Sequence, residues 1–390
     1  MSTMDLCRTA LRLCRDGEGF LFTPGGSRTL MTDCFGVLAA EMCGDLETDR
    51  EWWSRLGADI AARQGEDGHW AEPALKRSDL HGEHNMEYLR WQHSYFALNA
   101  MDALGMAPRR PLAFLAPFHD PAAAVEWLRA RNFQNFWYGS NEIMWLMAFL
   151  AWEQRAGAAW AAPVMDALLD ELDALQDART GYWGTDKGAS LLNGMAGAFH
   201  VYYFYFWRGR PVRHARTILD STLSLQHADG LFNPDGGGGA CHDLDAVDIL
   251  VKFSLIEPDH RPADVARALA AARKGLLSTR NADGGFCEQR WQPKRSWKRR
   301  AGEALGLDRL LGRRNPVQEP PYRYSGWRLM TCPMTTSNVW AAWFRPLALA
   351  LIGARYPEKF GGAETWTFRR LPGLGWHDPE RIGVSPQRAH

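Results

Sequence analysis

The stretch Gln226-His-Ala-Asp-Gly230-Leu-Phe232 has three relatives elsewhere in this 390-residue chain. They are Gln64-Gly-Glu-Asp-Gly68-His-Trp70, Gln176-Asp-Ala-Arg-Thr-Gly181-Tyr-Trp183 and Arg280-Asn-Ala-Asp-Gly284-Gly-Phe286. The last three glycines lie 49 and 54 residues apart, whereas the first two are 113 apart, about two such periods. We therefore expect a hidden, degenerate copy in residues 131–139. Recurrence at one period describes the architecture of a whole chain rather than a single site.

Each phrase lies between two apolar stretches of helical character, for example residues 164–175 and 191–207 around Gly181. Asp-Gly supplies the positive φ that ends the first helix, and the aromatic residue two positions later can pack back against the helix pair. A repeat of about fifty residues with two helices is too short to bury its own apolar face, so successive units must stack. Five or six helical hairpins in one domain, residues 1–390, predict an all-α fold, an (α/α)5-6 toroid.

Composition indicates a globular protein, because 46% of the residues are hydrophobic and 23% are charged. The formal net charge is zero, so no overall field recruits nucleic acid or an anionic membrane. Seven cysteines without a CxxC pair are typical of reduced thiols. We see no signal peptide, and charged residues or prolines interrupt the longest apolar runs. We expect a cytoplasmic protein without a nucleic-acid partner or an integral membrane segment.

Polar residues cluster where the second helix of each unit begins. In a closed ring the second helices form the inner layer, so these residues would meet at one mouth of a central cavity. Ser, Asn, Asp and Thr are also the usual N-cap residues, which accounts for about half of the cluster. The expected pocket residues are His84, Asn85, Glu87, Asn141, Glu142, Asn193, Trp145, Tyr202, Asp248 and Asn338.

The densest cluster runs from Gly236 through Cys241-His242-Asp243-Leu244-Asp245 to Asp248. Carboxylates that share a cavity of low dielectric repel one another's charge, so one of them can stay protonated near neutral pH and act as an acid. A neighbouring imidazole such as His242 can orient that acid. The alternative is that the acidic residues only stabilise the helix dipole, at about 0.3–1 kcal/mol each. Both interpretations stay open at this point.

The spacing Gln-x3-Gly-x-Trp/Phe, present at Gln64 and Gln226, resembles the QW motif of the terpenoid cyclase and protein prenyltransferase superfamily. The copy at Gln176 has one extra residue, and Arg280 replaces the glutamine in the last copy. The resemblance extends from about residue 50 to residue 353. It implies a toroid, but the superfamily includes cyclases, transferases and members that are not enzymes.

Class II terpene cyclases of this superfamily carry a D-x-D-D motif whose middle Asp protonates an alkene or epoxide. Asp243-Leu-Asp245-Ala246 is similar to its first part, which implies that Asp245 is the proton donor and that Asp243 and His242 are its partners. The fourth position is Ala246, and the next carboxylate is Asp248. Such cyclases also typically have two helical barrels, whereas this chain has length for one.

The prenyltransferase β-subunit is similar in size, but that resemblance would require an Asp/Cys/His zinc set. The adjacent Cys241 and His242 do not have metal-ligand spacing. We therefore expect no metal cofactor, except Mg²⁺ if the substrate is a diphosphate.

A basic insertion, residues 288–320, breaks the repeat, and we interpret it as a solvated loop or as a lid in which Arg299 and Arg300 hold an anion. Residues 1–45 and 354–390 lack the repeat and are expected to cap the ring or to form a tail.

The predicted function is acid-initiated cyclisation or rearrangement of a small isoprenoid substrate in an aromatic cavity, because π faces stabilise carbocations. One alternative is a polysaccharide or oligosaccharide lyase, with Asn141 or Asn193 and His84, His200 or Tyr202 in its site, or a glycoside hydrolase with Glu142 and Asp245 as its acids. Another is a non-catalytic binding scaffold.

Overall fold

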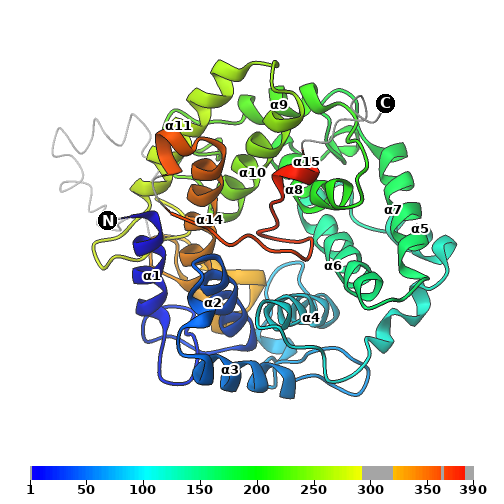
Figure 1. The fold of residues 1–390 in the computed structure, drawn as a ribbon, viewed down its shortest axis with the longest axis vertical. Coiled ribbons are helices and arrows are strands. Elements are labelled where there is room, and N and C mark those ends of the chain that lie inside the picture. The colour runs from blue at the N-terminus through cyan, green and yellow to red at the C-terminus, as the bar shows by residue number, and fades with distance from the viewer. Residues whose placement is uncertain (1, 292–318, 362–363, 383–390) are drawn as a thin grey trace, which may run out of the picture.

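The computed structural model describes residues 2–291, 319–361 and 364–382. Two concentric layers of helices account for most of this part of the chain (Figure 1). The outer helices are α1 (Thr3–Cys14), α3 (Arg50–Ala62), α5 (Pro121–Arg129), α7 (Ala161–Leu175), α9 (Ala215–Ser224) and α11 (Pro262–Ser278). The inner helices are α2 (Leu30–Met42), α4 (Met86–Ala103), α6 (Phe136–Arg155), α8 (Leu191–Trp207), α10 (Ala240–Ile256) and α14 (Val339–Arg355).

The inner helices form a closed ring. Each packs against the next in the order α2, α4, α6, α8, α10 and α14, and α14 packs against α2 (Figure 1). The chain therefore has the predicted all-α toroid fold, with six hairpins in the described ranges. Because inner helices have neighbours on every side, they are apolar nearly all round. In α8 every residue from Gly194 to Phe206 is buried.

The four repeated phrases form the turns that follow the outer helices α3, α7, α9 and α11, and their predicted roles are confirmed. All four Asp-Gly or Thr-Gly glycines have φ between 75° and 95°. The aromatic residue of each turn is completely buried, and the Trp70 and Trp183 indoles donate to carbonyl oxygens of the preceding outer helix. In the Gln226 turn, Nε2 donates to Gly230 O at 2.9 Å and to Ala268 O, on the next outer helix, at 2.8 Å. The glutamine thus joins neighbouring hairpins.

The hidden copy differs from the prediction. Residues 131–139 do lie at the connection between α5 and α6, but Gly139 is within α6 rather than in a left-handed turn. A Cβ at Gly139 would lie 2.6 Å from the carbonyl oxygen of Asn132, so this glycine permits close approach of the backbone instead.

The two ends of the chain also contribute to the ring. Residues 1–45, expected to cap it, instead supply its first hairpin, because α2 is the inner helix between α14 and α4. The C-terminal segment, residues 364–382, crosses the end of the ring where the inner helices finish (Figure 1). Its Thr367 N–H donates to Met42 O, and Trp376 stacks on Phe206.

The remaining elements are short. Strands β1 (Pro321–Arg323) and β2 (Thr331–Pro333) pair antiparallel, with Tyr322 opposite Cys332. Helix α15 covers Pro379–Ile382. Single 3-10 or π turns occur at Asp45–Glu47, Arg77–Asp79, Ala113–Phe118, Thr185–Lys187, Tyr324–Gly326, Arg328–Met330 and Pro357–Gly361. In the described part of the chain, no helix has both the length and the apolar character needed to cross a bilayer.

Candidate active site

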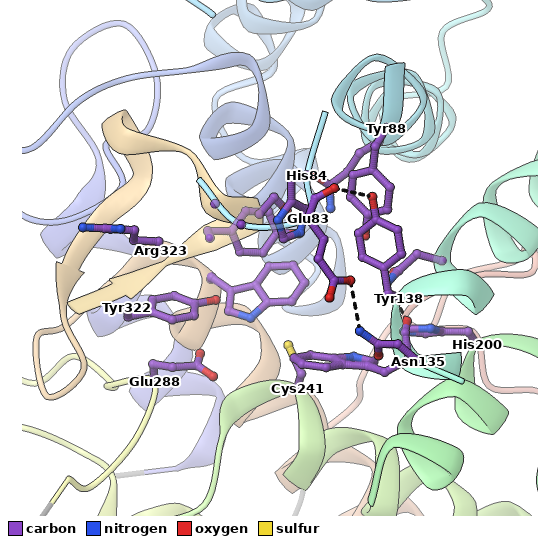
Figure 2. A pocket seen from close by; sticks show the side chains of 18 of the residues that line it. Glu83, His84, Tyr88, Asn135, Tyr138, His200, Cys241, Glu288, Tyr322 and Arg323 are labelled. Carbon is purple, nitrogen blue, oxygen red and sulfur yellow. Dashed lines mark hydrogen bonds between the residues drawn. The ribbon is translucent and has the colours of Figure 1, made fainter. Parts of the chain in front are cut away.

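A cavity of about 520 Å³ lies inside the ring, at the end where the inner helices begin (Figure 2). The first turns of α4, α6, α10 and α14 all contribute to its wall, which confirms that these helix starts converge. Helix α8 contributes only His200, from its middle, among the lining residues. The side chains from the inner helices are Tyr88, Gln92, Phe96, Trp137, Tyr138, Asn141, His200, Cys241, Asp245, Trp340 and Phe344.

Two loops cover the entrance. Residues 81–84 precede α4, residues 322–326 comprise the end of β1 and the turn after it, and both segments line the cavity. The His81 N–H donates to Gly326 O at 2.9 Å, which joins the loops. Gly326 has φ 67°, and a Cβ there would lie 2.2 Å from His81 O, so only glycine fits this junction. At the opposite end, Leu374 of the C-terminal segment closes the floor, and its N–H donates to the Tyr95 hydroxyl at 2.9 Å.

Aromatic rings dominate the wall. Tyr88 and Tyr138 stack with centroids 4.4 Å apart, and the His84 ring meets both of them edge-on. Trp340 and Phe344 stack at 3.7 Å on the α14 side. These rings present π faces or edges to whatever occupies the cavity, and π faces attract positive charge.

Asp245 is the carboxyl group that α10 presents to this cavity. Its side chain is 1% exposed, and within the described residues neither carboxyl oxygen has a hydrogen-bond partner. Burial raises the pKa of Asp245 well above its usual range, and the nearby carboxylates of Asp248, Asp243 and Glu288 raise it further. A carboxyl group in this environment keeps its proton to higher pH than an ordinary Asp and can donate that proton into the cavity.

Asp243, predicted to be a tuning partner of Asp245, is itself held in a buried network of hydrogen bonds and an ion pair. It accepts hydrogen bonds from the N–H groups of Phe232 (2.7 Å) and Gly239 (3.0 Å) and forms a buried ion pair with Arg345. It is absent from the cavity lining. Its influence on Asp245 is electrostatic, through the raised pKa.

His242 does not line the cavity either. Its ring packs on Trp137 with centroids 4.7 Å apart, and its Nε2 has no hydrogen-bond partner in the described ranges. Burial lowers the pKa of His242, so the ring is neutral at pH 7. His242 was predicted to orient or recharge Asp245, and within the described residues no hydrogen bond joins the two side chains. Asp248 forms a buried ion pair with Lys252 at 2.6 Å, one turn further along α10.

Of the other predicted pocket residues, His84 and Asn141 line the cavity. Asn85 and Asn338 are N-caps that accept from the N–H groups of Tyr88 and Ala341, so the capping interpretation holds for them. Glu87 lies in a separate surface depression with Arg77 and Met86.

The remaining predicted residues lie outside the cavity lining. Glu142 is ion-paired with Arg131 at 2.7 Å, and Asn193 donates to Asn135 at 3.3 Å. Trp145 packs behind Tyr88, and the Tyr202 hydroxyl donates to Gly181 O at 2.8 Å in a repeat turn. Arg299 and Arg300, with most of the predicted lid, are outside the described residues.

Sequence reasoning missed Glu288. This side chain lines the cavity, is 8% exposed, and accepts a hydrogen bond from the Ala240 N–H at 3.1 Å. Burial raises its pKa to about 7, against the opposing effect of Arg345. The sequence does contain a feature that could have indicated Glu288: it is a carboxylate two positions after Phe286, the aromatic residue of the fourth repeat. We had instead assigned Glu288 to the start of the basic insertion. The described residues contain no group of three or more His, Cys, Asp or Glu side chains placed to hold a metal ion.

No family model matches this chain, and no curated protein matches it. The solved structures that are similar to it include the following three. A polysaccharide lyase is 12% identical over 92% of this chain and 98% of its own, with a TM-score of 0.49. A type II terpene cyclase from Scytonema, in complex with its substrate geranylgeranyl dihydroxybenzoate, is 14% identical over 90% of this chain and 96% of its own, with a TM-score of 0.48. A protein from Actinoplanes is 14% identical over 90% of this chain and all of its own, with a TM-score of 0.45. One fold hosts many unrelated chemistries, and the site residues therefore carry the functional proposal.

Proposed function

We propose that this protein is an enzyme that starts the cyclisation or rearrangement of an isoprenoid substrate by protonating it. The observation that carries this proposal is the position of Asp245: a buried carboxyl group without a hydrogen-bond partner among the described residues, on the wall of an aromatic cavity. An unpartnered buried acid is costly to the fold, at about 1–3 kcal/mol, and such groups are concentrated at functional sites.

The proposed reaction begins when the Asp245 hydroxyl transfers its proton to one carbon of a substrate alkene. The alkene π electrons form the new C–H bond, the neighbouring carbon becomes a cation, and Asp245 becomes a carboxylate. A second alkene of the same chain attacks the cation to form a ring. Loss of a proton from the final cation yields a neutral product that is an isomer of the substrate.

The cavity supports each stage of this reaction. The apolar and aromatic wall excludes water that would capture the cation. The rings of Tyr88, Trp340 and Phe344 stabilise positive charge as it moves along the chain. Burial of Asp245 raises its pKa and so favours the protonated form that a proton donor needs. Under this proposal the chemistry needs no metal, and Mg²⁺ enters only if the substrate carries a diphosphate.

The test is conversion of farnesol, geranylgeraniol and their diphosphates in D₂O, followed by mass spectrometry. The proposal expects cyclic products that carry one deuteron from the solvent, and it expects Asp245→Asn to lose about 10²–10⁴-fold in rate, the usual contribution of a general acid. The melting temperature of the variant serves as the folding control. Unchanged conversion by a folded Asp245→Asn protein contradicts the assignment.

A glycan lyase is the second candidate, because His84, Tyr138 and Asn141 line the same cavity and supply a base and a neutralising amide. Incubation with uronate oligosaccharides distinguishes it, since a lyase forms an unsaturated sugar that absorbs in the ultraviolet. The hydrolase alternative is disfavoured, because Glu142 is paired with Arg131 and does not line the cavity with Asp245. If the protein is instead a non-catalytic binding scaffold, Asp245→Asn should leave its biological function unchanged.

A further inference from the structure

Glu288 is a second carboxyl group in the same cavity, and it reaches the cavity from a different element. It lies on the segment that follows the fourth repeat turn, whereas Asp245 lies on α10. Figure 2 shows Glu288 next to Tyr322 on the wall that also carries Cys241. One carboxyl oxygen, Oε1, accepts from Ala240 N–H, and the hydrogen bonds of the described residues leave Oε2 without a partner.

The position of Glu288 is set by Arg345. This completely buried guanidinium donates to the backbone carbonyls of Cys287 and Glu288 and forms the ion pair with Asp243 at the start of α10. One residue of α14 therefore fixes the Glu288 segment against the helix that presents Asp245. Such fixation is expected when two side chains must share one substrate.

The proposed reaction requires a proton acceptor as well as a donor. After Asp245 has given up its proton, the final cation has to lose another one to a base inside a cavity that excludes water. His200 is a weak candidate, because its Nδ1 is engaged by Ser140 at 2.9 Å and burial lowers its pKa to about 3. Oε2 of Glu288 has no hydrogen-bond partner among the described residues by distance and angle. Burial raises the pKa of Glu288 to about 7, although Arg345, the Ala240 N–H and the nearby Tyr322 hydroxyl oppose that increase, and the raised pKa makes its carboxylate a stronger base than an ordinary Glu.

We propose that Glu288 is the base that ends the reaction, taking the proton that the final carbocation loses. This inference rests on the proposed function. In this step a C–H bond adjacent to the cationic carbon breaks, its electron pair forms the product alkene, and the proton goes to Oε2 of Glu288. Asp245 is then a carboxylate and Glu288 a carboxylic acid. After product release Glu288 gives its proton to solvent and Asp245 takes one from solvent, which restores the starting state, so no other reactant is needed.

The experiment compares Glu288→Gln, Glu288→Asp and Glu257→Gln with the wild type, using the prenol that the wild type converts. Glu288→Gln keeps the shape of the side chain but removes the base. We expect the substrate still to be protonated, since Asp245 is intact, but the product to change to other alkene isomers or to an alcohol heavier by one water. We also expect kcat to fall about 10²-fold or more while KM stays constant.

Glu288→Asp retains a carboxylate and is expected to restore the wild-type product in part, which a merely structural role would not explain. Glu257→Gln removes a carboxylate that pairs with Arg216 on the outer surface, and it should change neither product nor rate. Melting temperatures check that each variant folds. If Glu288→Gln does not fold, the product and rate of Glu288→Asp test the role of Glu288 as the base.

The two proposals fail in different ways. If the wild type converts a prenol, Asp245→Asn does not, and Glu288→Gln gives the same product at the same rate, then the assignment of Glu288 is overturned while the proposed function stands. If the wild type converts none of the prenols or their diphosphates, the proposed function fails, and the role of Glu288 falls with it.

Discussion

Asp243 of α10 and Arg345 of α14 form an ion pair in which the two side chains are 1% and 0% exposed. The pair joins two neighbouring inner helices at the end of the ring that holds the cavity. Arg345 interrupts an otherwise apolar helix, and the sequence alone suggested only that this stretch would not span a membrane. The structure shows why a charge is placed there: it neutralises Asp243 and holds the backbone beside Glu288.

Breaking this pair should destabilise the protein strongly. Arg345→Leu leaves the Asp243 carboxylate buried without its cation, and loss of one partner of a buried pair typically costs about 3–5 kcal/mol. Urea unfolding followed by circular dichroism measures the change. Arg55→Ala is the control, because Arg55 and Glu51 form an exposed pair on α3, worth about 0.5 kcal/mol or less. Equal effects of the two substitutions would contradict the structural role of Arg345.

The pH dependence of activity should reflect Asp245. Because its pKa is raised, the protonated form persists to higher pH than in an ordinary Asp, and kcat/KM should fall as pH rises through that pKa. The groups that face Asp245 are Asp243 and Asp248 on α10 together with Glu288, while Arg345 and Lys252 partly neutralise them. Glu288→Gln removes one negative neighbour, so it should shift the alkaline limit to lower pH. A limit that does not move would show that the two carboxyls are uncoupled.

The same group affects stability. Since the pKa of Asp245 is higher in the folded state than in the unfolded state, its contribution is fully present at low pH and is lost as pH rises through the folded pKa. Asp245→Asn should therefore make the melting temperature less sensitive to pH in the range from the ordinary Asp pKa of 3.8 up to the raised pKa of the folded state. Parallel curves for the two proteins would mean that Asp245 is not titrating in the folded state.

Aromatic rings on the α14 side should stabilise the cation. Phe344→Leu keeps most of the apolar volume but removes a π face, and a loss of about 0.5–2 kcal/mol corresponds to a decrease of roughly 2- to 30-fold in kcat. Phe344→Tyr retains the ring and serves as the control. Steady-state conversion of the prenol measures both, and equal rates for the two variants would argue against a role of the ring.

Leu374 should limit the length of the substrate, because it closes the floor of the cavity. Leu374→Phe is expected to reduce conversion of geranylgeraniol more than conversion of farnesol, since the longer chain reaches further into the ring. Competition between the two prenols, with product ratios measured by mass spectrometry, provides the test. An unchanged ratio would place the end of the substrate elsewhere.

Gln226 should stabilise the fold without affecting the chemistry. Gln226→Met has a similar shape but cannot donate to Gly230 O and Ala268 O, and the loss of an intramolecular hydrogen bond typically costs about 0.5–1.5 kcal/mol. Gln154→Met is the matched control, because the Gln154 side chain accepts only one long hydrogen bond of 3.4 Å from Arg208. Urea unfolding compares the two, and the product of the reaction should be the same in both.

Much of the fold was predictable because its rules are local. Asp-Gly turns require positive φ, and a repeat that cannot bury its own apolar face must stack on its neighbours. The site was predictable only in part. Asp245 and His84 were found from their positions near helix starts, but the same reasoning also selected Asn85 and Asn338, which are N-caps. N-cap residues and pocket residues cannot be distinguished by this pattern, because both are polar residues located where a helix begins.

The sequence by itself determined a ring-forming repeat of helical hairpins and an acidic start to one inner helix. Only the tertiary structure decided which of those acids faces the cavity. Asp243 and Asp245 are two residues apart on one helix and so point in different directions, one toward Arg345 and the other into the aromatic chamber. Glu288 and Arg345 meet this helix from distant parts of the chain, and their charges acquire their roles only when the closed ring removes water from around them.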